Sequence, residues 1–403
     1  MTAISMSRVV AGGRSRFLVG VVFFVFFVIS FLTNILGPLV PDIIAGFHVS
    51  LTMAAILPFA FFIAYGVFSI PAGFAVERWG EKKIMVAAFV AATVGAASFA
   101  AFPGYSVAVT SLFVIGAGMA ALQVAINPLL RVAGGEEHFA FNSAFAQLIF
   151  GIASFLSPLV YSNLVGRGLA WVSIYWIFAV VAGLSVVLIA LLRLPKVERK
   201  EEESAGTLAM YRELLRNPFV WLYSLAIIAY VGCEQGTADW MSPFLERYHQ
   251  VDPHKGGADA VAYYWGLMTA GCLLGMGLLK LFDSRRVLIG FAIGALCMLS
   301  LALFGPADVA RWAFPAIGFF ASIMWPTLVS LGLNSVPQHH GPFAGILCSG
   351  IMGGALVPLL IGWLGDRYGL RVGMLFLYLT FGFVLSVGVW ARPLIRNATR
   401  TTA

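Results

Sequence analysis

The chain has 403 residues, of which 60% are hydrophobic and only 11% are charged, whereas about a quarter of the residues in a soluble domain are charged. This composition excludes a water-soluble fold and indicates a protein that lies largely in lipid. The net charge of +7 does not indicate nucleic-acid binding, because the basic residues lie between apolar segments rather than on one compact face.

The first predicted element is a membrane-spanning helix near the amino terminus. Three arginines (Arg8, Arg14 and Arg16) precede an uncharged run of 25 residues from Phe17 to Pro41. This run is longer than the apolar region of a signal peptide and fits a spanning helix, so we expect it to be retained.

Eleven further apolar stretches follow between short polar breaks, and each is predicted to span the membrane. One long hydrophilic segment divides the spans into six and six. It holds a charge run and then a short amphipathic pattern at Leu208, Tyr211, Leu214 and Leu215, which we interpret as a linker with a surface helix. The expected spans are roughly residues 17–40, 52–75, 84–102, 107–133, 137–165, 170–193, 218–247, 257–282, 286–304, 308–336, 341–364 and 371–391.

The sequence therefore predicts an all-α membrane protein with twelve transmembrane helices in two six-helix bundles. The bundles are expected at residues 1–193 and 218–403, joined by a cytoplasmic linker at 194–217. If the amino terminus is cytoplasmic, 19 of the 25 Lys and Arg residues lie on the cytoplasmic side. This bias follows the positive-inside rule and predicts that both termini are cytoplasmic.

The turn after the second span carries the stretch GFAVERWGEKK, in which five of eleven residues are charged. A glycine permits the tight reversal, and the lysines suit an anionic membrane surface; a simple positive-inside loop would account for the charge alone. The pattern G-x-x-x-[D/E]-R-x-G-x-[R/K]-[R/K] is more specific, and it resembles the signature loop of the major facilitator superfamily. The resemblance implies a latch at the inner gate made of charge pairs, formed by Gly73, Glu77, Arg78, Gly80, Lys82 and Lys83.

A second copy of this loop is expected between spans 8 and 9. There GLLKLFDSRRVL is degenerate, but it retains acidic and basic residues, and the resemblance implies gating roles for Asp283 and Arg286. A closer copy, GWLGDRYGLR from Gly362, follows span 11. The span count places it on the outer side, so we do not interpret it as the gate motif.

Three segments resemble the fucose:proton symporter family of sugar transporters: LQVAINPLL in span 4, YVGCEQGTADW in span 7 and SIMWPTLVSLGL in span 10. The resemblance implies a central sugar site and alternating access between two halves. It also reveals departures, because Gly37 and Gln123 stand where that family has acidic residues and Met276 stands near the place of an arginine. The coupling mechanism of the family is therefore not carried over.

Polar side chains within membrane spans are costly and are functional candidates by default. Gln123 and Asn127 share one helix face because they are four residues apart. Amides both donate and accept hydrogen bonds, which suits the neutral hydroxyls of a sugar, although an interhelical clasp would use the same groups. Asn34 in span 1 and Gln147 in span 5 are further candidates for lining the site.

Span 7 holds the only deeply placed carboxylate, Glu234, followed by Gln235 and Asp239. Glu234 and Asn34 both lie roughly 22–26 Å along their helices, and we expect them to face each other across the cavity if the two halves repeat. Sugar contact, proton coupling and a structural clasp all remain open for Glu234. Asp239 lies nearer the outer mouth and is a second candidate for coupling.

Aromatic residues complete the expected sugar site, because the C–H faces of a pyranose are apolar. Trp265, Trp325 and Trp240 could stack on such a ring, and Trp325 is the best placed because it lies in the middle of its span. One polar stripe follows it on span 10, made of Thr327, Ser330 and Asn334.

The sequence lacks a P-loop and any defensible catalytic or metal-binding constellation, so neither an enzyme nor an ATP-driven pump is predicted. We hypothesise a secondary active transporter of the bacterial cytoplasmic membrane that moves a neutral hexose, such as fucose, glucose or galactose, coupled to protons or sodium. A sugar uniporter and a drug or lipophile exporter are the alternatives. The expected partners are the sugar, a coupling cation and the lipid bilayer, with no cofactor and no nucleic acid, and the protein is expected to be a monomer.

Overall fold

The computed structural model describes residues 16–134, 139–192, 194 and 207–394. Within these ranges the chain forms helices and no strands, and twelve helical segments are long and apolar enough to cross a membrane. The predicted all-α fold with twelve spans is confirmed. The α-helices are α1 (Arg16–Thr33), α2 (Leu36–Phe47), α3 (Leu51–Trp79), α4 (Glu81–Ala101), α5 (Tyr105–Gly134), α6 (Phe139–Gly166), α7 (Ile174–Leu191), α8 (Leu208–Leu214), α9 (Pro218–His249), α10 (Ala258–Leu281), α11 (Ser284–Phe304), α12 (Ala307–Ala321), α13 (Met324–Leu333), α14 (His340–Ser349), α15 (Gly353–Tyr368), α16 (Leu370–Met374) and α17 (Phe376–Trp390).

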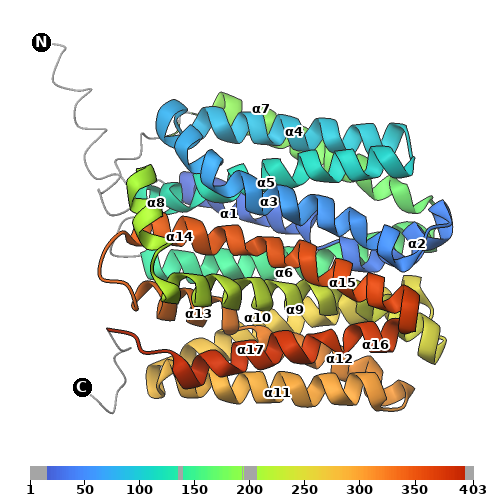
Figure 1. Ribbon diagram of the computed structural model, residues 1–403. Coiled ribbons are helices and arrows are strands. Elements are labelled where there is room, and N and C mark those ends of the chain that lie inside the picture. Colours follow the sequence, from blue (N-terminus) through green and yellow to red (C-terminus); the bar gives the residue numbers. More distant parts are fainter. Residues whose placement is uncertain (1–15, 135–138, 193, 195–206, 395–403) are drawn as a thin grey trace, which may run out of the picture.

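The spanning helices lie side by side and run between two ends of the molecule (Figure 1). Helix α8 lies at one end, where α1 begins and α17 ends, and we refer to this end as the terminus face. The end of α2 and the turn between α15 and α16 lie at the opposite end, the far face. Helix α8 occupies the position of the predicted amphipathic helix, and its Leu214 is buried.

The spans before and after α8 pack mainly among themselves. In the first half, α5 packs against α3 and α4, α4 against α7, and α1 against α6. In the second half, α12 packs against α10 and α11, and α9 packs against α17. The halves join mainly through α3 with α15, α6 with α10, and α2 with α9, and α3 also contacts α14.

Three spans are broken near their middle: span 11 at Gly350–Met352, between α14 and α15, and spans 1 and 10 at sites where a proline follows four residues later. Span 1 turns at Asn34, between α1 and α2, and Pro38 follows. Span 10 turns at Ser322 and Ile323, between α12 and α13, and Pro326 follows. A proline ring clashes with the carbonyl four residues before it and donates no hydrogen bond to it, so the helix opens there.

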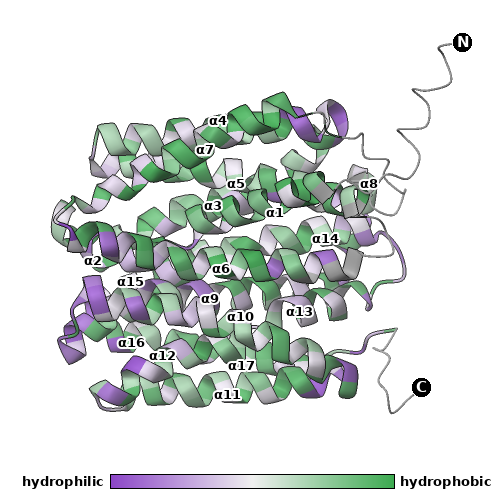
Figure 2. Ribbon diagram, turned by 180° about the vertical axis from the view of Figure 1, so that it is seen from behind, coloured by the Kyte–Doolittle hydropathy of each residue, from purple (hydrophilic) through white to green (hydrophobic). Residues whose placement is uncertain are grey.

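The outer surface of the bundle is apolar along its length and polar at its ends (Figure 2). Large apolar side chains such as Leu191, Leu379 and Val389 are more than 60% exposed. A soluble monomer rarely exposes so much apolar area in one band, whereas hydrocarbon solvates it well. The fold therefore positions buried polar side chains inside a lipid-facing wall.

Candidate transport site

The carboxylate of Glu234 on α9 lies at the centre of a polar cluster and is half-buried. It accepts hydrogen bonds from the Tyr230 hydroxyl and from Nε2 of Gln235, the latter at 3.3 Å. The Tyr264 hydroxyl of α10 donates to the Glu234 backbone carbonyl at 3.1 Å. Sequence reasoning missed both tyrosines, although the position of Tyr230 four residues before Glu234 was a usable signal.

Trp325 of α13 borders this cluster. Its ring centroid lies 6.3 Å from that of Tyr230, and its side chain is partly exposed. The structure therefore brings together three predicted residues, Glu234, Gln235 and Trp325. A carboxylate, an amide and an indole face in one place can bind hydroxyl groups and an apolar ring surface together.

Asp239 lies one turn of α9 beyond this cluster, toward the far face, and only 2% of its surface is exposed. Its Oδ2 atom has no hydrogen-bond partner among the described residues. Gly37 of α2 lies beside it, because a Cβ atom added at Gly37 would lie 3.4 Å from the Asp239 Cα and would collide with the Ala238 carbonyl oxygen. The α9 backbone at Ala238 and Asp239 is thus part of the contact between the two halves.

Gly37→Ala is expected to lower transport more than tenfold, because the added methyl collides with the α9 backbone only when α2 and α9 are in contact. Overpacking costs about 1–3 kcal/mol, and about 1.4 kcal/mol corresponds to a tenfold change in an equilibrium. Uptake of labelled hexose into proteoliposomes measures the effect. Gly20→Ala in α1 is the matched control, since nothing lies within 4 Å of its added Cβ; equal uptake by the two variants would contradict the expectation.

The polar candidates of the first half occupy different environments. Asn34 is buried, and its amide donates to the Ser154 hydroxyl of α6 at 2.8 Å, so it already joins α1 to α6. Oε1 of Gln123 is buried and has no partner among the described residues. Gln147 on α6 is exposed. The Asn127 side chain lies outside the described part of the structure.

The remaining candidates lie on α9, α10 and α13. Trp265 is buried, and its Nε1 has no partner among the described residues; the same holds for the Thr327 hydroxyl. The Asn334 amide donates to the Ser330 hydroxyl at 3.3 Å. Trp240 is fully buried and donates to the Pro358 carbonyl at 3.0 Å, so it packs inside the second half and has no face available for a sugar.

The predicted gating loop reverses the chain between α3 and α4. Gly80 has φ +84°, a left-handed conformation that favours glycine. The Lys82 ammonium does not extend toward lipid headgroups as expected, because it donates to the carbonyls of Ala190 and Leu192 at 2.7 Å each, where α7 ends. The exposed side chains at this turn are Glu77, Arg78, Trp79 and Lys83.

The loop between α10 and α11 uses its charges in a similar way. Asp283 caps α11 by accepting from the backbone N–H of Arg285 at 2.9 Å. The Arg285 guanidinium donates to the carbonyls of Gly388 and Val389 at the end of α17, while Arg286 is exposed. In each half, a basic residue after the loop binds the carbonyl end of the last helix, where the helix dipole favours positive charge.

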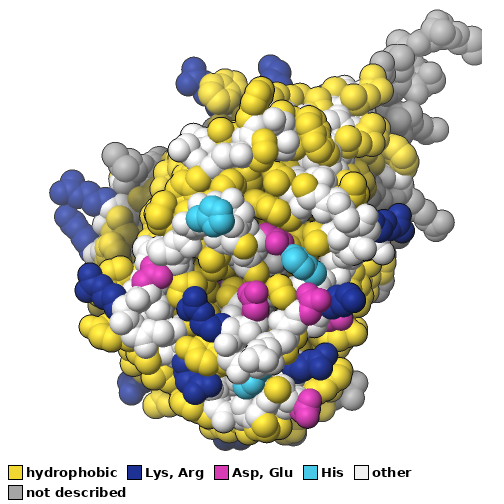
Figure 3. All heavy atoms as spheres, turned by 90° about the vertical axis from the view of Figure 1, so that its right-hand side faces the viewer, with side chains coloured by type: hydrophobic (Ala, Val, Ile, Leu, Met, Phe, Trp, Pro, Cys, Tyr) yellow, Lys and Arg dark blue, Asp and Glu magenta, His cyan; other side chains and the backbone are white. Residues whose placement is uncertain are grey.

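Two sets of hydrogen bonds join the halves at the far face, where charged and histidine side chains gather among apolar ones (Figure 3). The Asp366 carboxylate of α15 accepts from the backbone N–H groups of Leu51 and Thr52 at 2.9 Å each, and from the Thr52 hydroxyl at 2.5 Å. It therefore caps the first turn of α3 from the other half. Asp366 belongs to the stretch GWLGDRYGLR, which the structure places at the far face, in agreement with the span count.

The second set centres on Asp42 of α2. Its carboxylate lies 3.0 Å from Nε2 of His254 and also accepts from the Tyr161 hydroxyl of α6. The Ser162 hydroxyl donates to the His254 carbonyl at 2.5 Å. These contacts join residues more than 90 positions apart in sequence, so no local pattern indicated them. Together with Asp366, they hold the far face closed.

Asp366→Asn is expected to shift the protein by about fivefold toward a conformation with its far face open, because loss of a helix cap costs about 1 kcal/mol. Double electron–electron resonance between spin labels at two far-face positions, one in each half, measures the shift. Asp308→Asn, a change to another exposed far-face carboxylate, is the control and should leave the distances unchanged. A wild-type distance distribution in Asp366→Asn would contradict this role.

Twelve apolar spans, polar side chains at their inner contacts and a sealed far face define a multi-pass membrane transporter. The family model of the Major Facilitator Superfamily matches residues 22–352. The chain therefore belongs to the Major Facilitator Superfamily, and the predicted family is confirmed.

The curated relatives have transporter names. A glucose/galactose transporter of Brucella abortus is 30% identical over 387 residues, which cover 90% of this chain and 91% of the relative. A putative glucose/galactose transporter of Helicobacter pylori is 27% identical and covers 85% and 87% of the two chains. The L-fucose-proton symporter of Escherichia coli is 26% identical and covers 85% and 86%.

Solved structures share the fold. A crystal structure of the E. coli fucose:proton symporter FucP aligns with a TM-score of 0.68 at 21% identity and covers 94% of this chain and 100% of that one. An inward-facing, unoccupied bacterial homologue of the human lysosomal transporter Spinster aligns with a TM-score of 0.72 at 15% identity, covering 94% and 98%. The arrangement of the helices is thus that of known transporters.

Proposed function

We propose that this protein carries a neutral hexose across the bacterial cytoplasmic membrane by alternating access, with glucose and galactose as the first candidates. The cluster of Glu234, Gln235 and Trp325 supports this proposal most directly, because it combines hydrogen-bonding groups with an aromatic face at a depth where lipid offers neither. The names of the relatives from Brucella and Helicobacter support the same sugars. The buried acceptor of Gln123 and the buried hydroxyl of Thr327 are further hydroxyl ligands in this proposal.

Transport is proposed to be coupled to protons through Asp239. A buried carboxylate at this position has no partner among the described residues to offset its desolvation. The side chain is therefore suited to carry a proton while it is buried and to release it when it meets water. Helix α2 packs on the α9 backbone at Asp239 when the far face is closed, and in this proposal separation of these helices exposes the carboxyl group to water. In this proposal the proton-carrying side chain is Asp239 on α9. Gly37 of α2 stands where the fucose symporter family has an acidic residue.

The terminus face is proposed to be cytoplasmic, with α1–α7 and α9–α17 as the two halves that move. The 19 Lys and Arg residues assigned to that side support this orientation. With the far face closed, the structure then corresponds to a state that is not open to the outside. The gating roles of the loops at Gly80 and Asp283 belong to the same proposal, and so does a monomeric transporter.

Uptake into proteoliposomes tests the proposal. Labelled glucose, galactose and fucose are supplied with an imposed proton gradient, an imposed sodium gradient or none. Accumulation of a hexose driven by the proton gradient alone is the expected result. Equal uptake under all three conditions would replace symport by facilitated diffusion, and movement of a lipophilic cation with no hexose would identify an exporter.

A further inference from the structure

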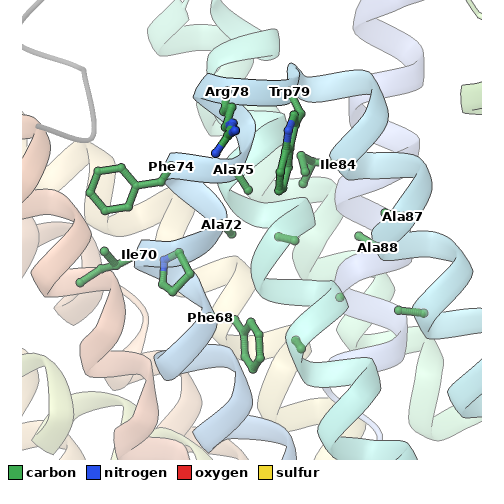
Figure 4. Close-up of a pocket in the computed structure, with 15 residues that line it drawn as sticks. Phe68, Ile70, Ala72, Phe74, Ala75, Arg78, Trp79, Ile84, Ala87 and Ala88 are labelled. Atoms are coloured by element: carbon green, nitrogen blue, oxygen red, sulfur yellow. The ribbon is translucent and has the colours of Figure 1, made fainter.

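An apolar groove of about 710 Å³ lies between α3, α4 and α5 near the terminus face, and the exposed side chains of Phe68 and Phe74 form part of its wall (Figure 4). Helix α5 packs against both α3 and α4, and small side chains along the three helices leave the space between them open. The volume falls in the range of ~300–1,000 Å³ typical of small-molecule sites. The small residues of the groove are Ala72, Ala75, Ala87, Ala88, Ala91, Ala117, Gly118 and Ala121.

Arg78 and Trp79 lie at the end of this groove, beside the turn between α3 and α4, and both side chains point along it (Figure 4). The guanidinium carbon of Arg78 lies 5.7 Å from the Trp79 ring centroid. The Arg78 side chain is exposed. An exposed arginine therefore stands at the polar end of an apolar groove.

Among the charged residues of the turn, all of which the structure describes, Arg78 alone lines the groove. Lys82 is bound to the carbonyls at the end of α7. Glu77 lies near α8: burial raises the pKa of the Tyr211 hydroxyl, and the Glu77 charge raises it further. Glu81 is buried. The charge that faces the groove is consequently positive.

We propose that this groove binds an acyl chain of an anionic phospholipid, with the lipid phosphate on the Arg78 guanidinium. The groove lies among membrane-spanning helices, so lipid is the solvent that reaches it, and its arginine lies at the end of a span, at headgroup depth. A guanidinium matches the oxygens of a phosphate in a bidentate way, and Trp79 suits the same interfacial layer. An anionic headgroup is favoured over a zwitterionic one because the latter adds a cation beside Arg78. This proposal is independent of the transported substrate.

Native mass spectrometry of the full-length protein, with phosphatidylglycerol or phosphatidylcholine added, tests the site. Wild-type protein is expected to retain phosphatidylglycerol at least tenfold better than phosphatidylcholine. Arg78→Gln should remove this preference, and Ala87→Phe, which fills the groove from an exposed position, should reduce retention of both lipids.

Two matched variants control for loss of charge and for added bulk. Arg286→Gln removes an exposed arginine from the corresponding turn of the second half, and Val180→Phe enlarges an exposed side chain on α7. Both should retain phosphatidylglycerol as the wild type does. Equal retention of the two lipids by wild-type protein, or an unchanged preference in Arg78→Gln, would overturn the proposal.

Discussion

Asp239→Asn is expected to abolish proton-driven accumulation of sugar while leaving sugar exchange intact. Asparagine keeps the size of the side chain, so the contact of α9 with Gly37 is preserved, but it cannot take up or release a proton in the cycle. Proteoliposomes with an imposed proton gradient should then reach only the external sugar concentration. Counterflow, in which internal unlabelled sugar exchanges for labelled sugar, should proceed at a rate near that of the wild type.

Asp259→Asn, which changes a partly buried carboxyl group on the far-face end of α10, is the control and should leave accumulation unaffected. If the Asp239→Asn variant still accumulates sugar against its gradient, another group carries the coupling proton and the proposed role of Asp239 is wrong. If accumulation in the wild type follows a sodium gradient instead, Asp239 is not a proton carrier.

Glu234→Gln is expected to weaken sugar exchange by about 10- to 100-fold, seen as a rise in the sugar concentration needed for half-maximal counterflow. A hydrogen bond to a charged group contributes about 1.5–3 kcal/mol, and the carboxylate can accept from two hydroxyls where an amide oxygen is a weaker acceptor. The neighbouring Tyr230 and Gln235 would also lose their charged partner. Counterflow at graded sugar concentrations measures the change.

The same variant separates the roles left open for Glu234. Normal counterflow with loss of accumulation would make Glu234 the proton site and would contradict a sugar contact. If the variant no longer elutes as a single folded species in size-exclusion chromatography, Glu234 has a structural role that joins neighbouring helices. Tyr230→Phe is the matched variant, because it removes one hydrogen bond to the carboxylate and keeps its charge; a smaller loss, of about tenfold or less, is expected.

Composition and periodicity were sufficient to predict the twelve spanning helices, whereas the superfamily was indicated by the resemblance of the GFAVERWGEKK loop. Twelve apolar runs must each become a helix, because backbone polar groups in lipid have to be satisfied within the span. The breaks at Asn34 and Ser322 were not predicted, although Pro38 and Pro326 carried the signal. A proline permits a break, but packing decides whether it occurs: Pro58 and Pro71 lie inside the unbroken α3.

The candidate site was predicted less completely, because the sequence of one span does not show which other spans pack against it. Glu234, Gln235 and Trp325 were predicted from their polar or aromatic character within spans; the structure pairs Glu234 with Gln235 and sets Trp325 beside Tyr230, and their role in sugar binding stays a prediction. The pairing of Asn34 with Ser154, and of Asp42 with His254, depends on how helices distant in sequence pack together. His254 was not among the predicted residues, because it lies between two spans and its partner Asp42 is 212 positions away in sequence.

The hydrogen bonds that close the far face at Asp366 depend on a side chain on one helix and mainly on backbone groups on the other. Two of its three donors are main-chain N–H groups of α3, which persist whatever side chains occupy positions 51 and 52, apart from proline. Substitutions therefore weaken this contact mainly when they replace Asp366 on α15. Homologues adapted to different sugar supplies are therefore expected to vary more at position 366 than at position 51, and substitution of Asp366 is one way to adjust the resting state of the carrier while the Asp42–His254 contact is kept.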